Sequence, residues 1–288
     1  MAVVNTNIAA SLAQSSLMKN ERALGTAMEQ LSTGRKINSA GDNAAGLAIS
    51  TRMSSQIRGL DAAIRNANDA VSMVNTAEGA LDEITTMLQR MRELAVQAGT
   101  GTTAAADRTY LQSEFTALRT EIDRIADNTQ WNGRNILDGS AGASTGKSTV
   151  AFGIGQDGTA AQTLSTSFGN FNNTTGKLSG LASKVITGTT IASAITVAAA
   201  AITEIDVVIA DVSAQRASFG AVSNRLTHAV DSLTNTKTNS EAARSRVLDT
   251  DYAAATSELA RTQIIQQAGT AMLAQANTMP QTVLALLQ

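Results

Sequence analysis

Two glycine-rich segments are the parts of this sequence that come nearest to nucleotide chemistry. The run Gly142-Ala-Ser-Thr-Gly-Lys-Ser148 is close to a phosphate-binding P-loop, but Ala141 stands where that pattern needs glycine, and strand-like alternation follows instead of a helix. The run Gly153-Ile-Gly-Gln-Asp-Gly158 matches G-x-G-x-x-G by letter. No long helix follows it, and Lys177 lies where the acidic residue expected about 20 positions on should be. Glycine-rich loops are the better interpretation of both runs.

Residues for metal or acid-base catalysis are equally sparse. The chain has no cysteine and a single histidine, His228, which excludes disulfides, thiolate nucleophiles and the usual zinc sites. Glu121 with Asp123, and Asp249 with Asp251, lie two apart on predicted helices and therefore point to different faces. We expect a protein that is not an enzyme and that has no cofactor, no catalytic residues and no metal ligands.

Two polar clusters remain. Arg90, Arg92 and Glu93 fall near the end of a predicted helix, where charge alone favours a solvated face over a recognition patch. Asn172 and Asn173 each begin a glycosylation acceptor pattern, although modification would require the right transferase, so a polar loop is favoured.

Long amphipathic helices account for most of the chain. Over residues 44–98 the apolar residues advance by steps of three or four, which is the seam of a coiled coil. Gly99 and Gly101 end this helix, and a second one begins just after Asp107 and folds back on it. Trp131-Asn-Gly133 then predicts a turn. The two rows are Met53, Ile57, Leu60, Ile64, Ala67, Val71, Val74, Ala77, Leu81, Ile84, Leu88, Met91 and Ala95, and Leu111, Phe115, Leu118, Ile122 and Ile125.

A third row with the same stepping lies near the C-terminal end. It is interrupted by Arg216 and Ser223, and polar residues in a seam usually fix register at some cost in stability. The row consists of Ile202, Ile205, Ile209, Val212, Arg216, Phe219, Ser223, Leu226, Val230 and Leu233.

Both ends of the chain also show helical apolar patterns, but neither has enough apolar surface for a core of its own. We expect them to pair with each other or with another subunit. Pro280 should kink or break the last helix, which predicts a frayed C-terminus in the free monomer. The patterns are Ile8, Leu12, Leu17, Leu24, Met28 and Leu31, and Leu248, Tyr252, Ala255, Leu259, Met272, Ala276, Met279, Val283 and Leu286.

The segment 141–194 is rich in Gly, Ser, Thr and Asn and has no helical row. Val150, Phe152 and Ile154 alternate with small residues, Asp157-Gly158 is a turn pair, and Ala161, Thr163 and Ser165 alternate after it. A β-hairpin is therefore predicted here.

The predicted fold class is mainly α: a long antiparallel helical, coiled-coil bundle with a small β-hairpin region and paired N- and C-terminal helices. We expect three parts, namely 1–44 with 245–288 (terminal helices), 45–140 with 195–244 (helical rod), and 141–194, with no large outer domain. An aromatic content of 3% agrees with helix-on-helix packing.

Charge and hydropathy narrow the function classes. There are 22 Lys and Arg against 24 Asp and Glu, so nucleic-acid binding is not expected. We find no window of about 20 apolar residues for a membrane span, and no basic region followed by an apolar stretch that would mark a cleavable signal peptide.

Several long motifs resemble bacterial flagellin, the flagellar filament subunit. They are Leu31-Ser-Thr-Gly-Arg-Lys-Ile-Asn-Ser-Ala-Gly-Asp-Asn-Ala-Ala-Gly-Leu-Ala-Ile49, Gln89-Arg-Met-Arg-Glu-Leu-Ala-Val-Gln97, Glu121-Ile-Asp-Arg-Ile125 before Trp131-Asn-Gly133, and Met272-Leu-Ala-Gln-Ala-Asn-Thr-Met-Pro-Gln-Thr-Val-Leu-Ala-Leu-Leu287. The family more often has Phe where this chain has Trp131. The resemblance covers about residues 1–140 and 195–288.

The resemblance implies an extracellular subunit of the bacterial flagellum that self-polymerises for motility. It also implies unfolded export by the flagellar type III apparatus, without a cleavable signal peptide, and assembly at the filament tip. The implied partners are other copies of the chain, the filament cap, the hook-filament junction protein, an export chaperone at the C-terminal helix and a host Toll-like receptor; nucleic acid and membrane insertion are not expected.

The resemblance also assigns residues. Polymerisation through the terminal helices is expected to bury Ile8, Leu12, Leu31, Met272, Val283, Leu286 and Leu287 against neighbours. Arg90, Leu94 and Glu114 match the Toll-like receptor contact, and Leu284, Leu286 and Leu287 match a segment read by cytosolic innate sensors.

Of three alternatives, only the first stays open to test. A hook-filament junction protein resembles flagellin at both ends but is not a polymer. A metallopeptidase inserted in the segment 141–194 would need two histidines in H-E-x-x-H, and this chain has one. A lipid-binding amphipathic bundle would need Lys-rich polar faces, which are missing.

Overall fold

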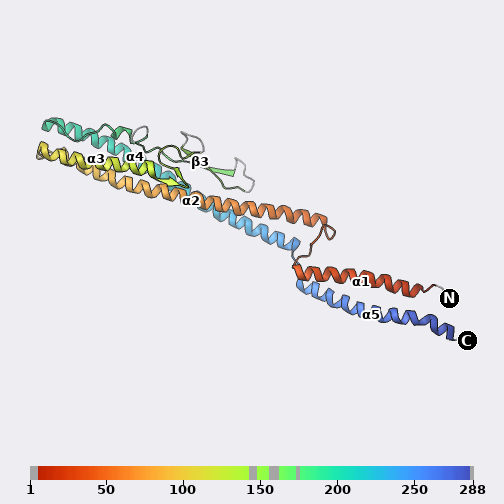
Figure 1. The fold of residues 1–288 in the computed structure, drawn as a ribbon. Helices are drawn as coiled ribbons and strands as arrows, with labels where there is room; N and C mark the ends of the chain where they lie inside the picture. Colours follow the sequence, from red (N-terminus) through yellow and green to blue (C-terminus); the bar gives the residue numbers. More distant parts are fainter. Residues whose placement is uncertain (1–5, 143–147, 156–161, 173–175, 286–288) are drawn as a thin grey trace. The chain divides into compact units, whose positions relative to one another are not determined.

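The computed structural model describes residues 6–142, 148–155, 162–172 and 176–285, with side chains to residue 278 in the last range. The helices are α1 (Ile8–Thr33), α2 (Ala44–Ala98), α3 (Ala105–Asn128), α4 (Ile191–Leu248) and α5 (Tyr252–Ala285), as Figure 1 shows. Two compact units are present, residues 58–237 and residues 1–57 with 238–288. The prediction of a mainly helical fold with a small β region is confirmed.

In the unit 58–237, ion pairs show that α2 and α4 run antiparallel. Lys237 Nζ lies 2.7 Å from Asp61 Oδ1, and Arg216 Nη1 lies 2.9 Å from Asp82 Oδ1. Asp61 to Asp82 is 21 positions along α2, and Lys237 back to Arg216 is 21 positions along α4. The two helices therefore keep one register over this length.

The buried row of α4 differs from the predicted one. Arg216 and Ser223 do not lie in the seam, because Gln215 and Val222 occupy the buried positions instead. Arg216 lies at the edge of the seam, where its guanidinium reaches Glu78 and Asp82 of α2. The observed row advances in regular steps of four and three, the heptad period: Ala194, Ala198, Ala201, Ile205, Val208, Val212, Gln215, Phe219, Val222 and Leu226.

The predicted buried row of α4 starts eight residues too late because the first buried residues of this helix are alanines. The row starts at Ala194, upstream of the predicted start at Ile202, and its first residues are small enough to be overlooked as core.

The same stretch corrects a second prediction, because α4 does contain an 18-residue window apolar enough by composition to cross a membrane. A single such helix is weak evidence for a span, and 28% of its window is buried inside the protein.

The turn between α2 and α3 is held by a buried arginine that sequence analysis did not single out. Arg108 is 2% exposed, and it donates from Nε to the Ala98 carbonyl at 3.1 Å and from Nη2 to the Thr100 carbonyl at 3.1 Å. Ala98 is the last residue of α2, so its carbonyl has no intrahelical donor, and Thr100 follows in the turn.

We expect Arg108→Ala to lower the free energy of unfolding by about 2 kcal/mol, because the buried Ala98 carbonyl and the partly buried Thr100 contact lose a charged donor. Urea unfolding followed by circular dichroism measures the change. Arg124→Ala is the matched control, since this guanidinium is exposed and pairs only with Glu121 on its own helix. An equal loss in both variants would contradict the capping role.

The strands form two small antiparallel pairs. β1 (Gln130–Trp131) and β2 (Arg134–Asn135) are joined by Asn132 and Gly133, whose φ angles of 50° and 75° suit the tight hairpin turn favoured by Asn-Gly. β3 (Thr149–Gly153) pairs with β4 (Thr163–Ser167), which confirms the predicted hairpin. The predicted turn pair Asp157-Gly158 and Ala161 lie outside the described residues.

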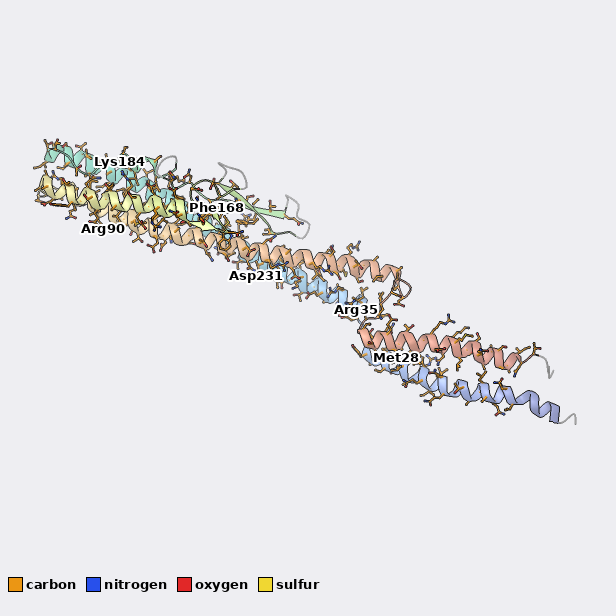
Figure 2. All side chains as sticks on the ribbon, in the orientation of Figure 1. Met28, Arg35, Arg90, Phe168, Lys184 and Asp231 are labelled. Atoms are coloured by element: carbon orange, nitrogen blue, oxygen red, sulfur yellow. The ribbon has the colours of Figure 1, made fainter. Side chains whose placement is uncertain are left out.

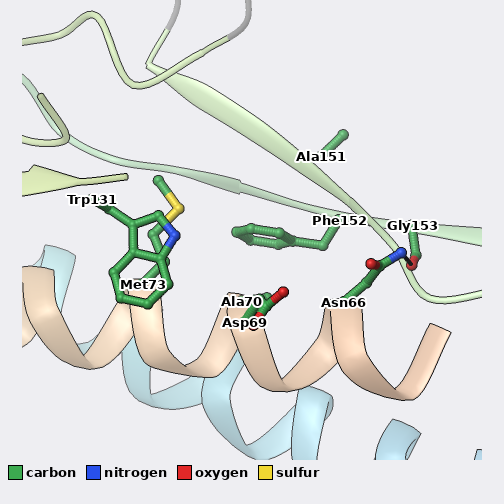
Figure 3. Close-up of a pocket in the computed structure, with 8 residues that line it drawn as sticks. All are labelled: Asn66, Asp69, Ala70, Met73, Trp131, Ala151, Phe152 and Gly153. Atoms are coloured by element: carbon green, nitrogen blue, oxygen red, sulfur yellow. Dashed lines mark hydrogen bonds between the residues drawn. The ribbon is translucent and has the colours of Figure 1, made fainter. Parts of the chain in front are cut away.

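Both hairpins lie against α2, where they border a hollow of about 290 Å³. Figure 3 shows Trp131, Met73 and Phe152 along this hollow and Asn66 reaching toward Gly153. Asn66 Nδ2 donates to the Gly153 carbonyl at 3.2 Å, which ties the end of β3 to the helix.

Asp138 orders the loop that follows β2. Its carboxylate accepts from the Ser140 N–H at 2.8 Å and from Asn135 Nδ2 at 3.1 Å. Partial burial raises the pKa of Asp138, but the hydrogen bonds from Ser140 and Asn135 outweigh burial and bring the pKa below its ordinary value of 3.8.

A carboxyl with a lowered folded-state pKa stabilises the fold above its unfolded pKa, and this stabilisation is lost as the pH falls through the folded pKa. We expect Asp138→Asn to lower stability by about 1 kcal/mol at pH 7, and the difference from the parent to be smaller at about pH 3, where protonation of the carboxyl has begun to remove its contribution. Thermal unfolding at both pH values measures this, with the exposed Asp231→Asn as the control. A difference that persists unchanged at low pH would contradict the assignment.

Candidate assembly surface on the terminal helices

Local signals at their ends define the two terminal helices. Asn7 begins α1, and its Oδ1 accepts from the Ala10 N–H at 3.0 Å. Gly34 ends α1 in the left-handed conformation with φ 69°, and its N–H bonds to the Gln30 carbonyl. Asp251 begins α5, where its Oδ1 accepts from the Ala253 N–H at 2.9 Å.

α1 and α5 lie side by side, as Figure 1 shows and as predicted. The residues between them follow a heptad on each helix, and most are small or polar. Among these, α1 buries only Asn20 and Ala27. The two rows are Ala10, Ala13, Leu17, Asn20, Leu24, Ala27 and Leu31 on α1, and Ala255, Leu259, Thr262, Gln266, Gly269, Leu273 and Ala276 on α5.

Two asparagine side chains cross from α1 to the backbone of α5. Asn7 Nδ2 donates to the Ala276 carbonyl at 2.7 Å, and Asn20 Nδ2 donates to the Thr262 carbonyl at 2.8 Å. Backbone contacts at the other end, from the Lys36 N–H to the Leu248 carbonyl at 2.7 Å and from the Thr250 N–H to the Gly34 carbonyl at 3.0 Å, complete the alignment.

Several large apolar residues of α1 and α5 are exposed outside this seam. Ile8 is 70% exposed, Leu12 is 68% exposed and Met272 is 65% exposed, and Met28 is also exposed on α1 (Figure 2). Large exposed apolar surfaces mark contact sites for other molecules. Among the described side chains of the two helices, the exposed large apolar residues are Ile8, Leu12, Met18, Met28, Tyr252, Ile264, Ile265 and Met272.

The predicted polymerisation residues fall into three groups. Ile8, Leu12 and Met272 are exposed, whereas Leu31 is half-buried in the seam that faces α5. Val283 lies in α5, but its side chain is outside the described part, as are Leu286 and Leu287 and the proposed sensor residue Leu284.

Sequence reasoning missed Met18, Ile264 and Ile265 as candidates for this surface. Two adjacent isoleucines on a helix cannot both face one seam, and this signal could have identified Ile264 and Ile265.

The sequence predicts that Pro280 kinks or breaks the last helix, and the structure contradicts the break, because α5 continues through Pro280 to Ala285. A proline inside a helix deprives the carbonyl four residues earlier of its donor. That carbonyl belongs to Ala276 and accepts the amide of Asn7, so the lost hydrogen bond is replaced from α1.

Of the three residues predicted to contact a receptor, Arg90 and Glu114 are exposed and Leu94 is not. Arg90 Nη2 lies 2.9 Å from Glu114 Oε1 and Nη1 lies 3.0 Å from Glu93 Oε2, in an exposed group. Hydrogen bonds with Glu114 and then Glu93 raise the pKa of the Arg90 guanidinium. Leu94, by contrast, is fully buried in the core, so a partner cannot touch it in this conformation.

The described residues hold no group of three or more His, Asp or Glu side chains that could bind a metal ion, and His228 is exposed on α4. The P-loop-like run lies largely outside the described residues, and β3 rather than a helix follows it. Residues 156–158 of the second glycine pattern are also outside them.

Comparison with known proteins agrees with the motifs. The family model for the bacterial flagellin N-terminal helical region matches residues 4–142, and that for the C-terminal helical region matches residues 202–287. A flagellin of Halalkalibacterium halodurans is 42% identical over 286 residues, which covers 99% of this chain and 100% of that protein.

Two further comparisons concern a longer relative and a solved structure. Flagellin A of Vibrio cholerae is 35% identical over an alignment of 375 positions, 99% of each chain, so this relative has residues that the present chain of 288 lacks. The crystal structure of Bacillus cereus flagellin has 32% identity and a TM-score of 0.48, over 62% of this chain and 94% of that one.

Flagellins are structural proteins rather than enzymes, and they form the helical homopolymer of the extracellular flagellar filament. Matches to both helical regions, together with relatives that align over the whole length, place the chain among them. The chain belongs to the bacterial flagellin family.

Proposed function

We propose that the terminal helix pair, α1 with α5, is the surface through which this flagellin adds to a growing filament. The observation that carries the proposal is the set of exposed large apolar residues on both helices, which lie outside the seam where the helices meet. Head-to-tail packing that does not close into a ring generates a helical polymer. In such a polymer Ile8, Leu12 and Met272 are buried by neighbouring copies.

Residues 1–44 with 245–288 are proposed to line the core tube of the filament, and residues 45–140 with 195–244 to surround it. The seam between α1 and α5 is built from small and polar residues and buries little apolar surface. Helices of this kind gain most of their stability from packing, so they order fully only when neighbours cover them. Amide hydrogen exchange tests this, because strongly protected terminal helices in the free monomer would contradict ordering on assembly.

Weak pairing of the terminal helices also suits passage through a narrow export channel. We propose that the chain leaves the cell unfolded by the flagellar type III route, with a chaperone on the C-terminal helix. Addition at the tip would then involve the filament cap, and the first copies would meet the hook-filament junction protein.

Recognition by a host Toll-like receptor is proposed for the exposed group of Arg90, Glu93 and Glu114. Leu94 is proposed to act only by supporting this surface from the core. Arg90→Ala is therefore the informative variant, since Leu94→Ala would leave a cavity. The C-terminal residues Leu284, Leu286 and Leu287 are proposed as the segment read by cytosolic sensors.

Seeded elongation tests the main proposal. Purified full-length chain is mixed with short filament fragments at neutral pH, beside a copy that ends before Met272, and filament length is measured by electron microscopy. We expect only the full-length chain to elongate the seeds. Circular dichroism of the shortened copy checks that α2, α3 and α4 remain folded.

The hook-filament junction alternative predicts a different result. A junction protein would leave the seeds at their original length even with the full-length chain. Long filaments from the full-length chain alone would therefore exclude the junction assignment.

A further inference from the structure

The apolar residues between α1 and α5 do not by themselves define how the two helices align. Leu17, Leu24 and Leu31 recur every seven residues on α1, and Leu259, Gln266 and Leu273 recur every seven on α5. A slide of one heptad would therefore place much the same side chains in contact. Repeated seams of this kind need a polar contact to specify register.

The Ala276 carbonyl is the one position on α5 that differs from its neighbours in hydrogen bonding. Pro280 is the sole proline of the chain and has no N–H, so ahead of the last turn of α5 only Ala276 loses its helical donor. A carbonyl shielded from water and without a donor is costly, and the hydrogen bond from Asn7 to the Ala276 carbonyl is partly buried. This carbonyl can therefore distinguish one register from the others.

The side-chain amide of Asn7 makes one hydrogen bond through its oxygen and another, to the Ala276 carbonyl, through its nitrogen. Its Oδ1 accepts from the Ala10 N–H at 3.0 Å and its Nδ2 donates to the Ala276 carbonyl at 2.7 Å. A flipped amide would set oxygen against the carbonyl and nitrogen against the N–H, so both partners hold the side chain in one orientation.

We propose that Asn7 is a positioning residue that acts with Asn20 and with the backbone contacts near Gly34 to set the register of α1 on α5, by taking the carbonyl that Pro280 leaves without a donor. In a register slid by one heptad the Ala276 carbonyl would have neither its helical donor nor the amide of Asn7. The register decides which apolar side chains of the two helices form one exposed face. The inference thus deepens the proposed assembly function and rests on it.

Engineered disulfides can read the register directly, since the chain has no cysteine of its own. Gly269 lies against Leu17, because a Cβ at position 269 would be 2.6 Å from Leu17 Cδ1. Leu17→Cys with Gly269→Cys therefore reports the observed register. Leu17→Cys with Ala276→Cys reports a slide of one heptad and leaves the Ala276 carbonyl in place.

Asn7→Asp separates the two roles of the residue. The carboxylate keeps an oxygen that caps α1, whereas the donor to Ala276 is lost. Oxidation of the full chain is followed on non-reducing gels, both in solution and in seeded filaments, so that crosslinks within a chain are distinguished from dimers. We expect Asn7→Asp to lower the ratio of observed to slid crosslink by about tenfold.

Pro280→Ala supplies the decisive comparison, because an alanine N–H at position 280 can bond to the Ala276 carbonyl within the helix. In this background we expect Asn7→Asp to change the ratio by less than about twofold. A residue that only caps α1 would give the same change with and without Pro280. Asn277→Asp, an exposed change of the same kind beside Ala276, should leave the ratio at the parental value.

Equal changes in both backgrounds, no change on Asn7→Asp, or the absence of the Leu17→Cys with Gly269→Cys crosslink from the parent would each overturn the proposal. These results are separate from the assembly test. A chain that keeps its crosslink ratio but does not elongate seeds would contradict the proposed function and leave the register assignment intact.

Discussion

Leu12→Asp is expected to lower the rate of seeded elongation at least about 100-fold, because filament contacts would have to bury a carboxylate without a partner. Leu12 is 68% exposed in the subunit, so the same change should leave the fold of the free chain intact. Electron microscopy of seeded samples measures elongation, and circular dichroism measures folding. The substitution is therefore expected to slow elongation without destabilising the free subunit.

Leu12→Met provides the control, since it keeps an apolar side chain of similar volume at the same place. This variant should elongate seeds at nearly the parental rate. If Leu12→Asp also elongates at that rate, the exposed face of α1 is not buried in the filament, and the proposed assembly surface is wrong.

Phe219→Ala should lower the free energy of unfolding of the unit 58–237 by about 3 to 5 kcal/mol, the usual effect of removing a buried phenylalanine ring. Phe219 is fully buried on α4, and its ring centroid lies 5.1 Å from that of Phe168, which follows β4. The variant therefore loosens the attachment of the hairpin as well as the helical core. Urea unfolding followed by Trp131 fluorescence and by circular dichroism measures both.

Val207→Ala is the matched control on the same helix, because Val207 is an exposed residue of α4. Its stability should stay within about 0.5 kcal/mol of the parent. Similar losses in the two variants would show that the Phe168 and Phe219 contact is not part of the core.

The helices and their pairing could be predicted from the sequence because apolar residues recur with a helical period over long runs. The seam of α4 was displaced because its first members, Ala194, Ala198 and Ala201, are small, and a search for large apolar residues passes over them. Gln215 was missed for a different reason: its amide is buried, but Nε2 donates to the Ser167 carbonyl at 2.7 Å, a partner far away in the sequence.

For the candidate site, the exposed apolar residues of α1 and α5 could be anticipated, but the contacts of Asn7 and Asn20 could not. Each bonds to a carbonyl more than 200 residues away along the chain, and no local pattern encodes that pairing. Leu94 was predicted as a receptor contact from its resemblance to the family. It is instead buried, because it lies on the side of α2 that faces the core.

The hairpin formed by β3 and β4 is a place where additional residues can be inserted into the chain. Gly153 and Thr163 are paired across β3 and β4, so the two ends of any additional polypeptide placed between them are already held together. Closing even a long extra loop there costs little more entropy than closing a short one. This connection is therefore a natural point for displaying a foreign peptide or a whole inserted module while the helices beneath remain unchanged.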